Sequence, residues 1–397
     1  MTKARYFKLI LILGALTALG PFSIDMYLPG FAGIAKDLNT TVANVAMTLS
    51  SYFIGISAGQ LLYGPLLDRY GRKKPLFIGL LVYILASLGC VFVQDIDTFI
   101  GLRFIQAIGS CAATVASVSM VRDLFPVRDI PKVFSLLMLV VGLSPMLAPT
   151  VGGYVTAAYG WHMVFLILMF IGIVILFAAQ FGLPNSYTPD SSISLKPKPI
   201  LLNFGIVLKE PQFYTYAFTG AIAFSGLFTY VAASPILFMD IFNVDAKTYG
   251  WIFAFMSLSF ILASQLNSVL LKWFSSEKMI YGALVTQSVI VIAFLICSLN
   301  DFLGLYETIA LLFLFLACLG ISNPNTAGLT LAPFTRNAGS ASALMGAIQL
   351  GLGAFASFAV GVFVKNSMVS MVVIMTVSTV TALVVLIIGK RTIKTKY

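Results

Sequence analysis

Long apolar runs constrain this chain more than any other feature of its sequence. About twelve segments, each of roughly 20 mostly apolar residues, follow one another along the 397 residues, and such a segment forms a helix that can cross the hydrocarbon core of a bilayer. Apolar residues make up 59% of the chain and charged residues only 10%, against about 25% charged in a soluble domain. The sequence therefore predicts an all-α integral membrane protein, and it excludes a soluble enzyme, a secreted disulfide scaffold and a disordered chain. The predicted spans are 8–29, 42–66, 75–94, 98–121, 132–154, 162–184, 211–235, 247–271, 279–298, 304–326, 338–363 and 367–389.

The first apolar run has some features of a secretory signal peptide. It follows Lys3, Arg5 and Lys8, and a basic start before an apolar stretch is typical of such signals. However, the run is long, contains Pro21 and Asp25, and has no clear small-residue cleavage site. We therefore expect it to be the first spanning helix.

The basic residues indicate how the chain is oriented in the membrane. If the N-terminus is cytoplasmic, twenty of the 24 lysines and arginines fall in inner segments, three fall in outer segments, and Arg103 lies within a helix. Cytoplasmic loops carry the excess of basic residues, so this distribution predicts that both termini are cytoplasmic. The net charge of +10 then has a topological cause, and no nucleic-acid partner is expected.

The longest polar stretch divides the chain into two halves. Residues 185–210 contain several prolines and lysines, and they predict a cytoplasmic linker between six-helix bundles at 1–184 and 211–397. A weak repeat agrees with this division, because the sequence Ala-Gly-Gln-Leu at 58–61 is matched by Ala-Ser-Gln-Leu at 263–266. Two parallel halves of this kind form one of the known transporter architectures.

Asp25 is the most informative single residue. It lies in the outer part of the first run, between Pro21 and Pro29, and it is the only carboxylate clearly within a predicted span. An ionisable group at membrane depth costs about 2.5 kcal/mol or more and usually faces a cavity or a partner. Because burial favours the protonated form of a carboxyl group, Asp25 can bind a proton from one side of the membrane and release it to the other. The alternative is an aspartate at a helix end, hydrated by the outer headgroups.

Arg103 is the only basic residue within a predicted span. Gln106 follows three residues later, on the same face of the helix. An arginine keeps its charge, so at this depth it needs a carboxylate, a carbonyl oxygen or water as partner. It can thereby influence the protonation of a nearby acid. The alternative is an arginine near a helix end that reaches toward Asp95 or Asp97.

Two further motifs indicate gating or close packing. The loop at 64–73 has the spacing Gly-x-x-x-Asp-Arg-x-Gly-Arg-Lys, and the fifth run has two prolines four residues apart, followed by two glycines. Glycine allows a tight turn or a close approach of two backbones, and proline bends a helix. A simple topology anchor and generic glycine packing are the competing interpretations. The gating residues predicted from the two motifs are Gly64, Asp68, Arg69, Gly71, Arg72, Pro145, Pro149, Gly152 and Gly153.

Taken together, these motifs resemble the major facilitator superfamily, and in particular its twelve-helix drug:proton antiporters. The loop at 64–74 is similar to the signature between helices two and three, Arg103 and Gln106 fit the fourth-helix signature, and the segment 142–153 is similar to the antiporter motif. The segment 21–29 resembles the Bcr/CflA branch of bicyclomycin- and chloramphenicol-resistance exporters. Two departures from the family motifs are Ala107 and Ala148, where glycine is common.

The resemblance implies two six-helix bundles that give alternating access to a central cavity. We expect export of amphiphilic drugs in exchange for protons across the bacterial inner membrane by a monomer. Asp25 would carry the proton together with Arg103, and Asp68 and Arg69 would pair across the halves or with helix ends. The residues expected to line the cavity are Phe22, Tyr27, Gln106, Met138, Met146, Phe224, Phe228 and Tyr230.

Three other classes of protein are alternatives to this expectation. A proton-coupled importer of a sugar or similar nutrient uses the same fold, but few buried charges are present to hold a polar solute. A membrane enzyme would need a nucleophile with a base, or a metal cluster. The only histidine is His162, and the four cysteines lie in apolar runs without metal-site spacing, so we expect no metal and no cofactor. A receptor would need a soluble signalling domain, which we do not expect here.

Overall fold

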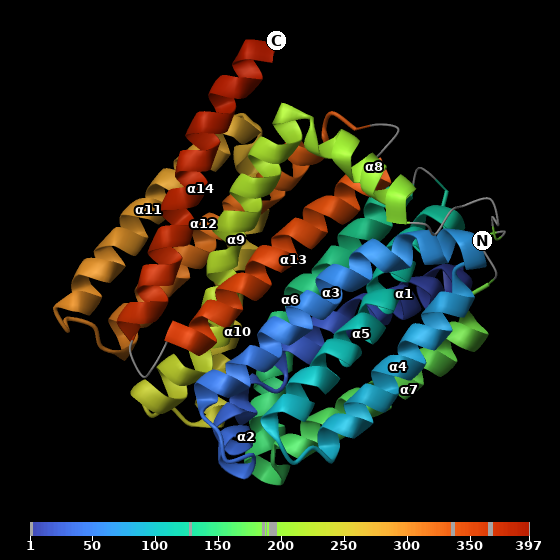
Figure 1. Cartoon of the computed structure of the whole chain (residues 1–397), viewed down its shortest axis with the longest axis horizontal. Coiled ribbons are helices and arrows are strands. Elements are labelled where there is room, and N and C mark those ends of the chain that lie inside the picture. The colour runs from blue at the N-terminus through green and yellow to red at the C-terminus, as the bar shows by residue number, and fades with distance from the viewer. Residues whose placement is uncertain are drawn as a thin grey trace. The chain divides into compact units, whose positions relative to one another are not determined.

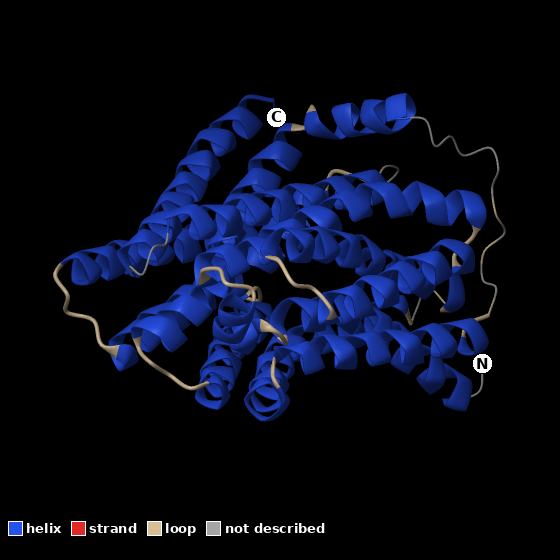
Figure 2. Ribbon diagram, turned by 60° about the horizontal axis from the view of Figure 1, so that its bottom comes forward, coloured by secondary structure: helices blue, strands red, loops and turns tan. Residues whose placement is uncertain are grey.

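The protein is helical throughout the part that the computed structural model describes, which comprises residues 3–126, 129–184, 187, 189, 197–334, 338–363 and 368–396. No strand occurs in these ranges (Figure 2). Twelve helical segments among them are long and apolar enough to cross a membrane. The predicted all-α fold with twelve spans is therefore confirmed, and the first run is a span at Arg5–Asp37 rather than a short signal segment.

The helices of the first half lie between residues 3 and 182 (Figure 1). They are α1 (Lys3–Asp25), η1 (Leu28–Gly30), α2 (Phe31–Asp37), α3 (Val42–Tyr70), α4 (Lys73–Val91), α5 (Ile96–Leu124), α6 (Ile130–Tyr159) and α7 (Trp161–Gly182).

The remaining helices begin inside the expected linker, where α8 forms. They are α8 (Pro197–Leu208), α9 (Pro211–Pro235), η2 (Ile236–Ile241), α10 (Ala246–Leu270), α11 (Ser276–Leu299), α12 (Leu305–Leu331), α13 (Ala338–Phe363) and α14 (Met368–Lys396).

Several helices extend beyond the ends that the sequence predicts. Pro29 lies in the short helix η1 rather than closing the first span, because proline is tolerated in the first turn of a helix, where no N–H is needed. The seventh span continues past Pro235 as the π-helix η2 and contains the exposed Asp240. The prediction that Asp25 is the only carboxylate within a span is therefore wrong, although Asp240 is exposed and Asp25 is buried.

The same helix pairings occur in both halves of the chain. In the first half α4 packs against α5 and α7, and α1 packs against α5, α6 and α7. In the second half α11 packs against α12 and α14, and α9 packs against α12, α13 and α14. Small residues from both copies of the sequence repeat lie at helix contacts, since Gly59 faces Cys111 on α5 and Ala263 faces Gly320 on α12.

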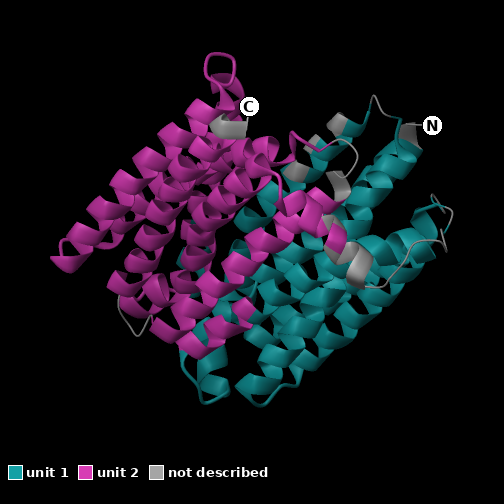
Figure 3. Ribbon diagram, turned by 45° about the horizontal axis from the view of Figure 1, so that its top comes forward, with its two compact units in different colours: residues 1–41, 51–196, 246–251 teal, residues 42–50, 197–245, 252–397 magenta. Residues whose placement is uncertain are grey.

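Contacts between residues group the chain into two compact units (Figure 3). The first unit comprises residues 1–41, 51–196 and 246–251, and the second comprises 42–50, 197–245 and 252–397. The predicted bundle limits at 184 and 211 stay a prediction.

The start of α5 fixes the helix that carries Arg103. Asp95 is the N-cap residue, and its Oδ1 accepts a 2.7 Å hydrogen bond from the backbone N–H of Thr98. This bond satisfies one of the free N–H groups at the helix N-terminus, and it lowers the pKa of the Asp95 carboxyl group. Asp95 is thus occupied in capping α5.

Candidate functional site

Arg103 lies fully buried in the first unit, with a side-chain exposure of 0%. Its Nη1 donates a hydrogen bond to Oε1 of Gln106, which confirms that the two residues share a face of α5. Its Nη2 donates to the backbone carbonyl oxygen of Ser23 on α1, at 2.8 Å. The alternative of an arginine that reaches toward Asp95 or Asp97 is therefore wrong.

Two aromatic rings hold the charge of Arg103 in place of a carboxylate. Its guanidinium carbon lies 4.3 Å from the ring centre of Tyr27 and 4.2 Å from that of Tyr52. No ion pair of Arg103 occurs among the residues that the structure describes. A buried guanidinium is stabilised by the faces of aromatic rings, and the free carbonyl groups at the C-terminal end of α1 carry partial negative charge. Arg103 therefore caps the end of α1.

A chain of hydrogen bonds links α1, α4 and α5 around this arginine. Gln106 Nε2 donates to Ser87 Oγ at 2.7 Å, and Ser87 Oγ donates to the carbonyl oxygen of Tyr83. The Tyr83 hydroxyl group donates to Ser23 Oγ at 2.8 Å, because the Ser23 hydroxyl donates to the carbonyl oxygen of Leu19. Ser23 and Tyr83 were missed in the sequence. The signal that could have found them is the presence of hydroxyl side chains inside apolar runs, where polar groups must pair.

Asp25 is the last residue of α1 and has an exposure of 5%. It follows Ser23, the residue bound by Arg103, by two positions. Within the described residues the Asp25 carboxyl group forms no hydrogen bond or ion pair. Such burial does not fit an aspartate hydrated at a helix end. The acid and the arginine thus belong to the same end of α1.

The glycines of α6 lie where backbones come close together in the first unit. A Cβ atom at Gly152 would overlap the carbonyl oxygen of Met26, the residue after Asp25, and one at Gly153 would overlap that of Ala246. On the same stretch, the Thr150 hydroxyl group donates to the carbonyl oxygen of Gly250 at 3.1 Å. This segment of α6 therefore packs directly against the end of α1 that carries Asp25.

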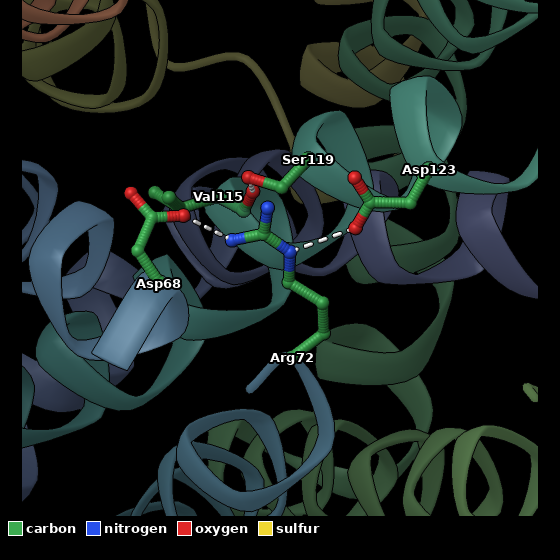
Figure 4. A network of polar contacts seen from close by, with 5 residues as sticks. All are labelled: Asp68, Arg72, Val115, Ser119 and Asp123. Carbon is green, nitrogen blue, oxygen red and sulfur yellow. Dashed lines mark hydrogen bonds and ion pairs between the residues drawn. The ribbon is translucent and has the colours of Figure 1, made fainter. Parts of the chain in front are cut away.

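The loop between α3 and α4 carries a compact ionic network (Figure 4). Arg72 Nη1 donates to Asp68 Oδ1 at 2.5 Å, and Arg72 Nε donates to Asp123 Oδ2 on α5 at 2.8 Å. Burial opposes the charge of Arg72, but its bonds to Asp123 and Asp68 outweigh that effect and raise its pKa. The described partner of Asp68, which lies in the last turn of α3, is thus the arginine four residues later in the chain. Asp123 was missed in the sequence, and the signal that could have found it is an acid in the last turn of a helix, next to Arg122.

The two glycines of this loop differ in their surroundings. Gly71 has a φ of +81°, a conformation that glycine adopts without strain, as expected for the tight turn. A Cβ atom at Gly64 would meet no described atom within 4 Å. The close approach expected at Gly64 is therefore absent from the described part of the chain. The guanidinium group of Arg69 lies 5.8 Å from the ring centre of Tyr70.

The residues predicted to line a cavity lie in different surroundings. Tyr27 and Gln106 are fully buried in the Arg103 site, and Tyr230 stacks on Phe253 at 5.6 Å. The rings of Phe224 and Phe228 meet at 5.4 Å on α9. Phe22 and Met146 are half-buried, and the side chain of Met138 lies outside the described residues. Their role in binding stays a prediction.

Metal ligands do not gather in the described ranges. No three His, Cys, Asp or Glu side chains lie close enough there to hold a metal ion. A buried acid beside a capped helix end, inside a bundle of apolar helices, is typical of a secondary transporter.

Comparison with known proteins identifies the family. The chain belongs to the Major Facilitator Superfamily, whose model matches residues 13–358, and it is a multi-pass membrane protein. It is 32% identical to the bicyclomycin resistance protein homolog of Haemophilus influenzae over 88% of this chain and 87% of that one. It is 29% identical to the chloramphenicol resistance protein of Pseudomonas aeruginosa over 74% and 70% of the two chains. The resemblance to this branch is confirmed.

The solved structures to which the chain is similar show the same fold. A crystal structure of a D-xylose–proton symporter aligns with a TM-score of 0.75 at 14% identity, over 95% of this chain and 97% of the other. At this identity the likeness establishes the major facilitator fold alone.

Proposed function

We propose that this transporter exports amphiphilic drugs from the cytoplasm in exchange for protons, by alternating access. Support comes from the family and from two relatives named for resistance to drugs. The observation that carries the proton part is the burial of the Asp25 carboxyl group at the C-terminal end of α1. A carboxylate there meets both desolvation and the negative end of the helix dipole, so its charge depends strongly on which side of the membrane it can reach.

In this proposal Arg103 determines how protonation of Asp25 affects the end of α1. Arg103 is always charged, and it holds the carbonyl of Ser23 two residues before the acid. Protonation of Asp25 from outside changes the charge balance at the end of α1 and weakens drug binding. After the transporter reopens inward, Asp25 releases the proton. Movement of one unit charge across 100 mV supplies about 2.3 kcal/mol.

The remaining parts of the proposal concern orientation and assembly. We infer that the transporter acts as a monomer in the bacterial inner membrane. Both termini would lie in the cytoplasm, because this orientation places most of the lysines and arginines in cytoplasmic segments. The halves 1–184 and 211–397 would move as the two rocking bundles. The loop at 64–74, which carries Asp68, would latch the cytoplasmic side in the outward-open state.

The test is transport by the purified full chain in proteoliposomes. Addition of drug to de-energised vesicles should release protons from the wild-type protein, and Asp25→Asn should abolish that release. The matched control is Asp97→Asn, an exposed acid in the first turn of α5, which should behave as wild type. Uphill export at an unchanged rate by Asp25→Asn would refute the coupling role, and uptake of an ethidium-like dye would favour the importer.

A further inference from the structure

A groove on the first unit lies where the C-terminal end of α6 meets the start of α10. Residues 246–251 belong to this unit, and they approach α6 so closely that a Cβ atom at Gly153 would lie 2.3 Å from the carbonyl oxygen of Ala246. The groove begins one residue further along each segment, at Tyr154 and Lys247. The close contact of the two backbones therefore forms one end of the groove.

The groove is large enough for part of an organic molecule. Its volume is about 310 Å³, at the lower end of the range for small-molecule sites. The described residues that line it are Tyr154, Val155, Ala157, Ala158, Tyr159 and Lys247. Both tyrosines are exposed, Tyr154 to 48% and Tyr159 to 72%. The groove is therefore accessible from outside the protein and has small apolar side chains between its polar groups.

Lys247 gives the groove its charge. Its Nζ lies 5.6 Å from the ring centre of Tyr154, which is a cation–π distance. The hydroxyl oxygen of Tyr154 accepts a 3.4 Å hydrogen bond from Nε1 of Trp251, so the O–H of this tyrosine can still donate. Among the lining residues that the structure describes, only Lys247 is charged, and the exposed Asp245 lies outside the lining. The groove therefore offers a positive charge and hydroxyl donors to an anionic group.

The groove lies at the level of the lipid headgroups. Tyr159 is the last residue of the span Leu139–Tyr159, and tyrosines are enriched where a span leaves the hydrocarbon region. A lysine at this level keeps its ammonium group in water while its alkyl stem covers apolar surface. The anions present at this level are the phosphate groups of the lipids. Under the orientation proposed above, the groove opens to the outer leaflet.

We propose that this groove binds one anionic phospholipid of the surrounding membrane. The lipid phosphate accepts hydrogen bonds from Nζ of Lys247 and from the hydroxyl group of Tyr159, and the first carbons of an acyl chain lie on Val155 and Ala158. Because the groove is formed by α6 together with residues 246–251, the bound lipid bridges these two segments beside their backbone contact. The site is independent of the transported molecule, so it does not rest on the export function.

The first experiment measures lipid binding through Trp251, which lies beside the groove. In the variant Trp161→Phe/Trp273→Phe it is the remaining one of 3 tryptophans, and lipids with brominated acyl chains quench its fluorescence on contact. In mixed micelles, brominated phosphatidylglycerol should compete against phosphatidylcholine with a relative binding constant of about five, the factor for one lysine near an anionic lipid. Lys247→Met should lower this constant to about one. The matched control is Lys36→Met, an exposed lysine on α2 of the same unit, which should leave the constant unchanged.

The second experiment uses the natural sequence and distinguishes a lipid from a soluble phosphate compound. Phosphatidylglycerol with a photoactivatable diazirine in its acyl chain is cross-linked to the purified full chain, and the segment 154–159 should be labelled. A large excess of glycerol 3-phosphate, which carries the phosphate without acyl chains, should not reduce this labelling. Loss of the labelling in that excess, or no labelling of this segment, would overturn the lipid assignment.

The quenching experiment tests the charge separately from the lipid chains. Equal binding of phosphatidylglycerol and phosphatidylcholine to the tryptophan variant would overturn the anionic site. The same loss of preference in Lys36→Met as in Lys247→Met would do so too, because it would show that the net charge of the protein, rather than this groove, selects the lipid. None of these results depends on transport of a drug, so the proposed export function stands or falls by its own test.

Discussion

The guanidinium group of Arg103 binds the backbone carbonyl oxygen of Ser23, 80 residues earlier in the chain, at 2.8 Å. A backbone carbonyl at the end of a helix is an orphan acceptor, and a fully buried arginine is a charge that needs acceptors. The bond therefore gives a partner both to this carbonyl oxygen and to Nη2 of the arginine. The bond fixes the end of α1, where Asp25 lies, to the N-terminal third of α5.

The first prediction concerns this bond. Arg103→Lys should reduce proton-coupled transport by about tenfold or more, because an ammonium group lacks the planar fork that binds Gln106 and Ser23 together and stacks on two rings. Drug-driven proton release in proteoliposomes measures the effect. Arg122→Lys, an exposed arginine at the end of the same helix, should keep wild-type activity. Full activity of Arg103→Lys would show that charge alone suffices.

The second prediction concerns the contact of α4 with α1. Tyr83→Phe and Ser23→Ala each remove the 2.8 Å hydroxyl contact, and hydrogen bonds between membrane helices contribute about 0.6 kcal/mol on average. We expect a coupling free energy of about that size in a double-mutant cycle of unfolding in mixed micelles. A coupling energy of zero would mean that the two hydroxyl groups do not stabilise the helix pair.

The third prediction concerns the contact of α6 with α1. Gly152→Ala would place a Cβ atom on the carbonyl oxygen of Met26, and overpacking of this kind costs about 1–3 kcal/mol. The two helices must separate next to Asp25, so we expect slower transport and a lower melting temperature. Gly101→Ala is the control, since a Cβ atom there meets nothing within 4 Å. A melting temperature of Gly152→Ala equal to that of wild type would contradict the close contact.

The fourth prediction ranks the two acids that bind Arg72. The side chain of Asp123 is 15% exposed and that of Asp68 is 43% exposed. Asp123→Asn should therefore destabilise the protein by about 1–3 kcal/mol, because it weakens the pairing of a buried charge, whereas Asp68→Asn should cost under about 1 kcal/mol. Chemical denaturation of the purified variants compares the two. The reverse order would show that exposure does not govern this pair.

Local features of the sequence determined the helices and part of the site. The length of an apolar run depends only on neighbouring residues, so twelve spans could be predicted. The pairing of Arg103 with Gln106 follows from a spacing of three residues on one helix. The tight turn at Gly71 was likewise readable, because it depends on the backbone of one residue. The ends of the first and seventh spans could not be predicted, because a proline is compatible with a helical turn that follows it.

Only the tertiary structure decided which distant residues meet. Nothing in the spacing of Arg103 indicates that Ser23, Tyr27 and Tyr52 surround it, and nothing near Arg72 indicates Asp123 on another helix. These contacts depend on how helices rotate and cross, which is set by the fit of many side chains at once. The sequence therefore specified that Asp25 and Arg103 enter the membrane, whereas packing specified the groups that surround these two side chains.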